Sequence, residues 1–170
     1  MQQFTIHLPV KAYVKKYLHQ KYGSPLTLSA GNVFSDVFLA MLLVPAPIKN
    51  QRRELDLQLN RYTEKVQVKI PIDLLYRVPN DLTEHSTGRL NRFFENMFKE
   101  DFCEKVEHLV SFGKIERQTA MEHFCVLYGF EMEEDISFDA LKKMEWRYRK
   151  EKAEKMQKSL AHLSPAVLFG

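Results

Sequence analysis

The strongest constraint on the fold is a stripe of apolar and aromatic residues that repeats every three or four positions between residues 82 and 112. Its members are Leu90, Phe93, Phe94, Met97, Phe98 and Phe102. Residues three and four apart lie on the same side of an α-helix, so this spacing predicts one long amphipathic helix that ends at Gly113. Such a helix needs an apolar surface to pack against, and the rest of the chain must supply it.

Two shorter helices are expected after the long one. A one-sided apolar pattern over roughly 116–128 predicts the first, with Gly129 as its C-terminal stop. Ser137 is a typical N-cap, and Asp139 then falls in the first turn, where the helix dipole favours an acid. The second half of the chain is therefore predicted to be helical.

The first half of the chain alternates apolar and polar residues, which is the period of a half-buried β-strand. This alternation predicts strands at 3–8, 54–59 and 65–71, with the last two paired as a hairpin. Apolar and amphipathic stretches predict helices near 11–22 and 30–43. We therefore expect an α+β fold in which helices cover a small antiparallel sheet, followed by a C-terminal helical subdomain that is loosely helix-turn-helix-like.

Two local signals and a division into parts complete this prediction. Ser29 is the expected N-cap of the second helix. The stretches FTIHLPVKAY and VQVKIPIDLLY both run strand, proline, aliphatic residue and tyrosine, which indicates two strands side by side that each feed a helix. The elements divide into an α+β portion at 1–80, a helical portion at 81–160 and a tail at 161–170, together one compact unit.

Positive charge is concentrated in two segments. The chain has 25 Lys and Arg against 22 Asp and Glu, a net charge of only +3. The first 35 residues nevertheless carry four lysines and no acid, and Ser137 to Lys158 carries eight basic against four acidic residues. Basic charge gathered on two elements indicates a polyanionic partner, most often nucleic acid, here DNA or RNA.

The last predicted helix carries most of the candidate binding residues. Its apolar side is formed by Leu141, Met144 and Tyr148, so beyond Tyr148 the helix is expected to project or to lie on the surface. Trp146 would stack on an unpaired base of a single-stranded target, or else pack against a neighbouring helix. The alternative is a solvated basic helix with no ligand. The residues expected to contact phosphate are Lys142, Lys143, Arg147, Arg149 and Lys150, with Lys11, Lys15 and Lys16 as a second, flanking patch.

The sequence carries no motif of an enzyme, a metal site or a cofactor site. It lacks a phosphate-binding glycine loop, a Cys-x-x-Cys pair and a His-Glu-x-x-His motif, so we expect no catalytic residue, metal or cofactor. Cys103, His108, His123 and Cys125 do not share helix faces at their spacings, which favours buried thiols and surface histidines over a zinc site. Two cysteines and no secretory or membrane-spanning segment indicate a reducing, cytoplasmic setting.

A protein-interaction module is the alternative function. The predicted long helix has an acidic surface, and an acidic loop at Glu131 to Asp135 follows the next helix. Either could dock a basic partner, including the basic helix of a second copy in a homo-oligomer. The acidic surface consists of Glu95, Glu100, Asp101, Glu104 and Glu107.

Two resemblances point towards DNA. The stretch EKVQVKIPIDLLYRV resembles the strand and first turn of ribbon-helix-helix DNA-binding proteins, which implies Gln67 and Lys69 as outward residues; a structural hairpin is the alternative. The stretches LPVKAYVKKYLHQKYGSPLTLS and ISFDALKKMEWRYRKEK resemble small uncharacterised proteins of phages and mobile elements of gut Bacteroidetes. The second resemblance implies a cytoplasmic, DNA-associated accessory protein and transfers no catalytic residue.

Overall fold

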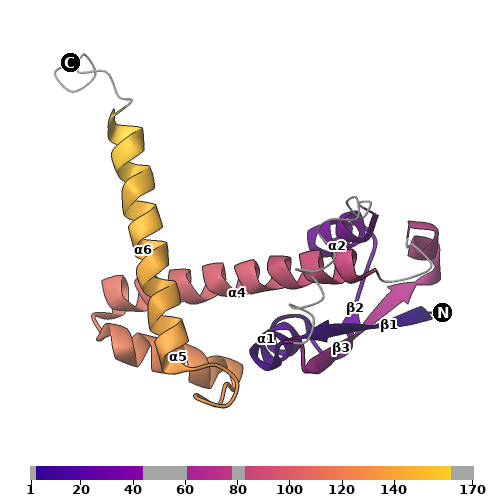
Figure 1. Ribbon diagram of the computed structural model, residues 1–170, viewed down its shortest axis with the longest axis horizontal. Helices are drawn as coiled ribbons and strands as arrows, with labels where there is room; N and C mark the ends of the chain where they lie inside the picture. Colours follow the sequence, from indigo (N-terminus) through magenta and orange to yellow (C-terminus); the bar gives the residue numbers. More distant parts are fainter. Residues whose placement is uncertain (1–2, 44–60, 78–82, 162–170) are drawn as a thin grey trace. The chain divides into compact units, whose positions relative to one another are not determined.

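The computed structural model describes residues 3–43, 61–77 and 83–161 of the chain. They form the predicted α+β fold, with a small sheet and a set of helices (Figure 1). The described residues divide into two compact units. The first unit runs to Phe98 and includes Cys125–Phe130, and the second contains Lys99–Phe124 and the residues from Glu131 onwards.

The helices agree with the sequence prediction to within a few residues. The long helix predicted from the aromatic stripe is a single helix, and the stops predicted at glycines are confirmed. At Gly129 the backbone has a φ of +64°, a conformation that glycine adopts without steric penalty. The helices are α1 (Ala12–Tyr22), α2 (Val33–Leu43), α4 (Glu84–Gly113), α5 (Arg117–Tyr128) and α6 (Phe138–Ala161), with a 3₁₀-helix at Ile72–Arg77.

The sheet has three strands in the order β1-β3-β2: β1 (Gln3–Val10), β3 (Glu64–Pro71) and β2 (Leu26–Thr27). β1 and β3 are antiparallel, and β2 runs parallel to β3. The prediction that the strands of the two similar stretches lie side by side is confirmed, although a 3₁₀-helix follows β3. β2 is too short to show alternation, and the strand predicted at 54–59 lies outside the described residues.

The position of β3 bears on the resemblance to ribbon-helix-helix proteins. The prediction that Gln67 and Lys69 face outwards is confirmed, since Gln67 is exposed and Lys69 is partly exposed, while the alternate residues Val66, Val68 and Ile70 are buried. However, β3 is the central strand, with β1 on one edge and β2 on the other. β1 pairs with the whole length of β3 on one edge, whereas on the other edge β2 pairs with it at Val68 and Lys69. At least one edge of β3 is therefore closed to a two-stranded ribbon with a second copy.

Helix α2 begins later than predicted, and its cap is not Ser29. The side-chain oxygen of Asn32 accepts hydrogen bonds from the backbone N–H groups of Phe34, at 2.9 Å, and Ser35, at 3.4 Å. Gly31 has a φ of +74°, so the chain is still turning two residues after Ser29 and cannot yet be helical. Ser29 instead donates its N–H to the Ser35 hydroxyl at 3.0 Å.

The first unit packs the N-terminal part of α4 against β1 and α1. Leu90, Phe94 and Phe98 are fully buried, at four-residue spacing. The Phe98 ring centroid lies 5.6 Å from that of Tyr17, and Asn91 Nδ2 donates a 2.7 Å hydrogen bond to the carbonyl of Pro9. The start of the aromatic stripe thus lies in the core of the unit that contains the sheet.

The second unit has its own core. The rings of Phe102, on α4, and Phe124, on α5, meet edge to face with centroids 5.1 Å apart. Cys103 and Leu141 are fully buried in the same unit. Burial, reinforced by the charge of Glu145, raises the pKa of the Cys103 thiol to about 12, so the thiol is neutral at physiological pH.

Residues of the acidic loop and of the turn after it cap the N-terminus of α6. Ser137 Oγ accepts from the N–H of Ala140 at 3.2 Å, which confirms the predicted cap. Glu133 Oε1 accepts from the N–H of Phe138 at 3.0 Å, so a carboxylate also lies at the positive end of the helix dipole. The loosely helix-turn-helix-like description of α5 and α6 stays a prediction.

The predicted burial of both cysteines, and the exposure of His108 and His123, are confirmed. Within the described ranges, no three His, Cys, Asp or Glu side chains are grouped so as to hold a metal ion. The helices of those same ranges include none that is both long enough and apolar enough to cross a bilayer.

Candidate nucleic-acid interface

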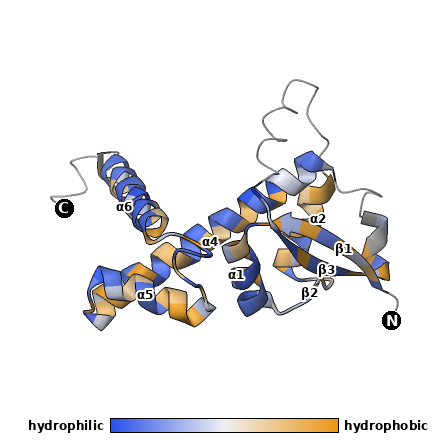
Figure 2. Ribbon diagram, turned by 60° about the horizontal axis from the view of Figure 1, so that its bottom comes forward, coloured by the Kyte–Doolittle hydropathy of each residue, from blue (hydrophilic) through white to orange (hydrophobic). Residues whose placement is uncertain are grey.

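Helix α6 changes character at Tyr148. Before it, Leu141 and Glu145 are buried, and Met144 and Tyr148 are partly exposed. From Arg149 to Leu160 every residue is exposed, and Figure 2 shows α6 as predominantly hydrophilic. The prediction that the apolar side ends near Tyr148 is therefore confirmed, and the C-terminal half of α6 presents its charged side chains to solvent.

Three of the predicted residues form one exposed stripe. Lys143, Arg147 and Lys150 follow i, i+4, i+7 spacing, which places them on one side of the helix, opposite the buried Leu141 and Glu145. All three are exposed, and none has an ion pair within the described part of the chain. We call these three residues the basic stripe. The helix thus has a continuous cationic surface about two turns long.

A row of alternating aromatic and cationic residues runs beside the basic stripe. Phe138, Lys142, Trp146 and Lys150 follow one another at four-residue intervals. Lys142 Nζ lies 4.5 Å from the ring centroid of Phe138, and Lys150 Nζ lies 5.5 Å from that of Trp146. Trp146 is 54% exposed, so much of its ring remains open to a ligand. The row combines phosphate-binding charge with rings on which a base can stack.

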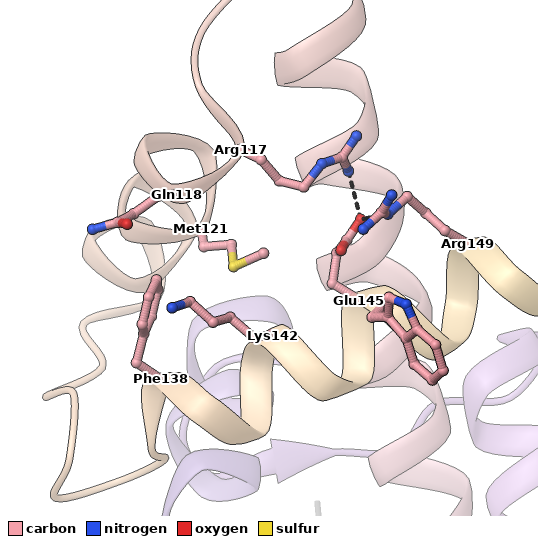
Figure 3. Close-up of a pocket in the computed structure, with 8 residues that line it drawn as sticks. Arg117, Gln118, Met121, Phe138, Lys142, Glu145 and Arg149 are labelled. Carbon is pink, nitrogen blue, oxygen red and sulfur yellow. Dashed lines mark hydrogen bonds and ion pairs between the residues drawn. The ribbon is translucent and has the colours of Figure 1, made fainter.

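The role of Glu145 was not predicted from the sequence. This side chain is 2% exposed, and its Oε1 accepts a hydrogen bond from Arg117 Nη1 at 2.5 Å and forms an ion pair with Arg149 Nε at 2.6 Å. Arg117 also donates to Glu107 Oε1 at 2.8 Å (Figure 3 shows the Arg117–Glu145 pair). The four-residue spacing from Leu141 could have placed Glu145 on the buried side, but its partner Arg117 could not have been found that way.

The buried carboxylate holds two guanidinium groups in place. Burial lowers the pKa of Arg117, but its hydrogen bond to Glu107 and the charge of Glu145 outweigh that effect and raise it, so Arg117 stays cationic. Arg149 uses only Nε for Glu145. Within the described part of the chain, no hydrogen bond involves its Nη1 or Nη2, so both can still donate.

A pocket of about 310 Å³ adjoins this network. In Figure 3, Arg117, Glu145 and Arg149 lie on one side of it, Phe138, Lys142 and Gln118 lie on the other, and Met121 lies between them. The volume is at the lower end of the range for small-molecule sites. The lining residues are Arg117, Gln118 and Met121 of α5 and Phe138, Lys142, Glu145, Trp146 and Arg149 of α6.

The second predicted patch, on α1, differs from the basic stripe because two of its lysines form ion pairs. Lys11 Nζ lies 2.9 Å from Glu95 Oε1, and Lys15 Nζ lies 2.8 Å from Glu64 Oε2. Lys16, beside Lys15, is partly exposed and has an interaction of its own. Two of the three cations are therefore already neutralised by acids of the same unit, although their role as a phosphate-binding patch stays a prediction.

Comparison with known proteins adds no relative to this picture: no family model, no curated protein and no solved structure matches the chain. The function is therefore inferred from the chemistry of α6 and its neighbours. These supply exposed cations, exposed aromatic surface and a small lined pocket within one unit.

Proposed function

We propose that the protein is a non-enzymatic, cytoplasmic nucleic-acid-binding protein that holds phosphates with the basic helix α6. The observation that carries the proposal is the basic stripe, in which three exposed cations share one side of the helix without an ion pair among the described residues. Exposed Lys and Arg clustered along a helix are the electrostatic footprint of nucleic-acid binding.

The spacing of the stripe suits a phosphate backbone. A helix rises about 1.5 Å per residue, so the outer two α-carbons of the stripe are about 10 Å apart along the axis. Phosphates of one strand of a duplex follow at about 3.4 Å along its axis, so the stripe spans about three of them. Binding by three such contacts releases counterions and makes affinity fall steeply with salt.

The biological setting is inferred from the sequence. The association with a phage or mobile element depends on the two stretches that resemble proteins of such elements, the second of which covers the N-terminal part of α6. Within that setting the protein would be an accessory or regulatory factor acting in replication, transposition or regulation. The phosphate-binding proposal does not depend on this assignment.

The test is fluorescence anisotropy of labelled duplex and single-stranded DNA at about 50 and about 200 mM salt. We expect binding that weakens strongly at the higher salt. Reversing the basic stripe (K143E/R147E/K150E) should abolish it. The matched control, K65E/R92E/K105E, makes the same change in net charge at exposed cations on other elements. Equal losses in both variants, or no binding by the unmodified protein at low salt, would refute the proposal.

Self-association is the second candidate, favoured by the far end of α6. Met156 and Leu160 are 60% and 63% exposed, and their four-residue spacing places them on one side of the helix. A second α6 could cover them, while the exposed Glu100 and Glu104 on α4 would attract its cations. Size-exclusion chromatography at low and high salt distinguishes this candidate, because it requires a dimer that does not depend on added DNA.

A further inference from the structure

The pocket beside α6 combines two features that a nucleotide needs. One is a pair of guanidinium groups held by the buried Glu145, with hydrogen-bond donors of Arg149 still unused. The other is an apolar surface made by Met121, 4% exposed, and by the rings of Phe138 and Trp146. Charge on one side of a small pocket and flat apolar groups beside it favour a ligand that is anionic at one end and planar at the other.

The charged side of the pocket suits a phosphate group. The guanidinium of Arg149 is anchored through Nε, which leaves its two terminal nitrogens to bind two oxygens of one phosphate. Lys142 lines the opposite side of the pocket, where its Nζ lies 4.5 Å from the ring centroid of Phe138. The carboxylate that lies nearest is already bound to Arg117 and Arg149, so its repulsion of an incoming phosphate is offset.

The size and the aromatic lining suit a single base. A pocket of about 310 Å³ accepts one nucleotide base rather than a base pair or a helix. Trp146 is 54% exposed and can stack on a base face, an interaction that all four bases can make. The amide of Gln118 offers polar groups at the pocket edge.

The pocket is also continuous with the basic stripe. Trp146 lies one helical turn from Lys142, which lines the pocket, and one turn from Lys150, which belongs to the stripe. A strand whose phosphates follow the stripe would therefore pass the open ring of Trp146 and reach the pocket. A base that is paired and stacked in a duplex cannot enter, whereas a single strand can present one.

We propose that this pocket receives one unstacked nucleotide of a single-stranded nucleic acid, with its base against Trp146, Met121 and Phe138 and its phosphate on Arg149. The inference rests on the proposed function and goes further, because it names single strands as the preferred ligand and the residues that select them.

The experiment uses the fact that Trp146 is the one tryptophan in the sequence. Its fluorescence is recorded while the protein is titrated with a single strand of about 12 nucleotides, with the matching duplex, and with a strand of the same length that lacks every base. Anisotropy of the labelled ligands is measured in parallel. We expect the single strand alone to change the tryptophan emission and to bind most tightly.

The variants separate stacking from phosphate binding. W146L should weaken single-strand binding about tenfold and leave duplex binding unchanged, while W146F should restore most of it. R149Q should weaken the intact and the base-free strand equally, because it removes a phosphate contact. Circular dichroism shows whether each variant is folded, and W146F remains informative even if W146L is not.

The outcomes distinguish the two proposals. If all three ligands bind equally by anisotropy and the tryptophan emission does not change, the pocket proposal is overturned while phosphate binding by α6 stands. If none of the ligands binds at low salt, both the proposed function and the pocket proposal are refuted. A change in emission with the duplex equal to that with the single strand would also overturn the selection for single strands.

Discussion

The two basic segments of this protein have the same excess of positive charge and use it differently. In the N-terminal segment, Lys11 and Lys15 lie within 3 Å of the carboxylates of Glu95 and Glu64. In α6, Lys143 and Arg147 are exposed and have no ion pair among the residues described. Equal charge along a sequence therefore does not mean equal capacity to bind an anion.

The lysines of α1 and the cations of α6 have similar affinity for phosphate, but only those of α6 are available to bind it without first leaving a carboxylate. An ion pair between partly exposed side chains contributes about 0–1 kcal/mol to stability, so Lys11 and Lys15 could exchange a carboxylate for a phosphate at little cost. When the lysine exchanges its carboxylate for a phosphate, however, the carboxylate is left unpaired near that phosphate, so the total negative charge at the site is not reduced. The basic stripe has no such competitor, so each contact it makes releases counterions in full.

The largest expected effect follows from neutralising each segment separately. K143A/R147A/K150A should weaken DNA binding at low salt by about 100-fold and reduce the slope of log affinity against log salt by about 2.7, which is three phosphate contacts. K11A/K15A/K16A should reduce that slope by less than about 1. Salt titrations of both variants by anisotropy measure the slopes. Equal slopes would show that the ion pairs of α1 do not limit its cations.

Ion pairs of different burial offer a second way to test the comparison. R117M removes one of two partners from the 2% exposed carboxylate of Glu145 and should lower the free energy of unfolding by about 2 kcal/mol. K15M breaks a pair whose side chains are 35% and 42% exposed, and should cost less than about 1 kcal/mol. Urea denaturation measures both. A loss from K15M as large as that from R117M would contradict this account.

A third effect is zero at neutral pH and develops only in alkali. Burial raises the pKa of Cys103, in the second unit, to about 12, and burial followed by the charge of Glu95 raises that of Tyr13, in the first unit. The folded state therefore keeps these protons longer than the unfolded state does. Stability should fall as pH rises above the ordinary pKa of each group, by at most about 1.4 kcal/mol per pH unit and group.

Conservative variants show how much each of the two groups contributes to this loss of stability at high pH. C103A should flatten the fall in stability between the ordinary thiol pKa of 9.0 and about 12, and Y13F should flatten the part that begins near 10.0. Thermal unfolding at a series of pH values measures the slopes, with the unmodified protein as reference. Slopes unchanged in both variants would show that neither buried proton contributes.

Local pattern was sufficient for most of the helices and for the two long strands. The stripe through Phe94, Phe98 and Phe102 predicted α4 because a period of about 3.6 is a property of neighbouring residues. Ser137 predicted the start of α6 for the same reason, and its hydroxyl makes the expected bond. Where a local signal failed, as at Ser29, a better cap was available three residues later, beyond the turn at Gly31.

The candidate site was predicted only in part. The sequence indicated the cations of α6 and the end of its apolar side, because both depend on spacing along one helix. It could not indicate that Arg117, 28 residues from Glu145, would join Arg149 on that carboxylate beside a pocket. In the sequence, a buried acid such as Glu145 cannot be distinguished from the exposed acids of the same helix until its partners are known.

By itself, the sequence determined which segments are helices or strands, where positive charge accumulates and where α6 stops burying side chains, since all of these depend on residues close along the chain. Only the tertiary structure decided which cations remain available, because a lysine is neutralised by whichever acid the fold brings beside it. Lys15 and Glu64 are 49 residues apart in the chain and 2.8 Å apart in space. Lys143, on a helix side that faces solvent, has no such neighbour among the described residues.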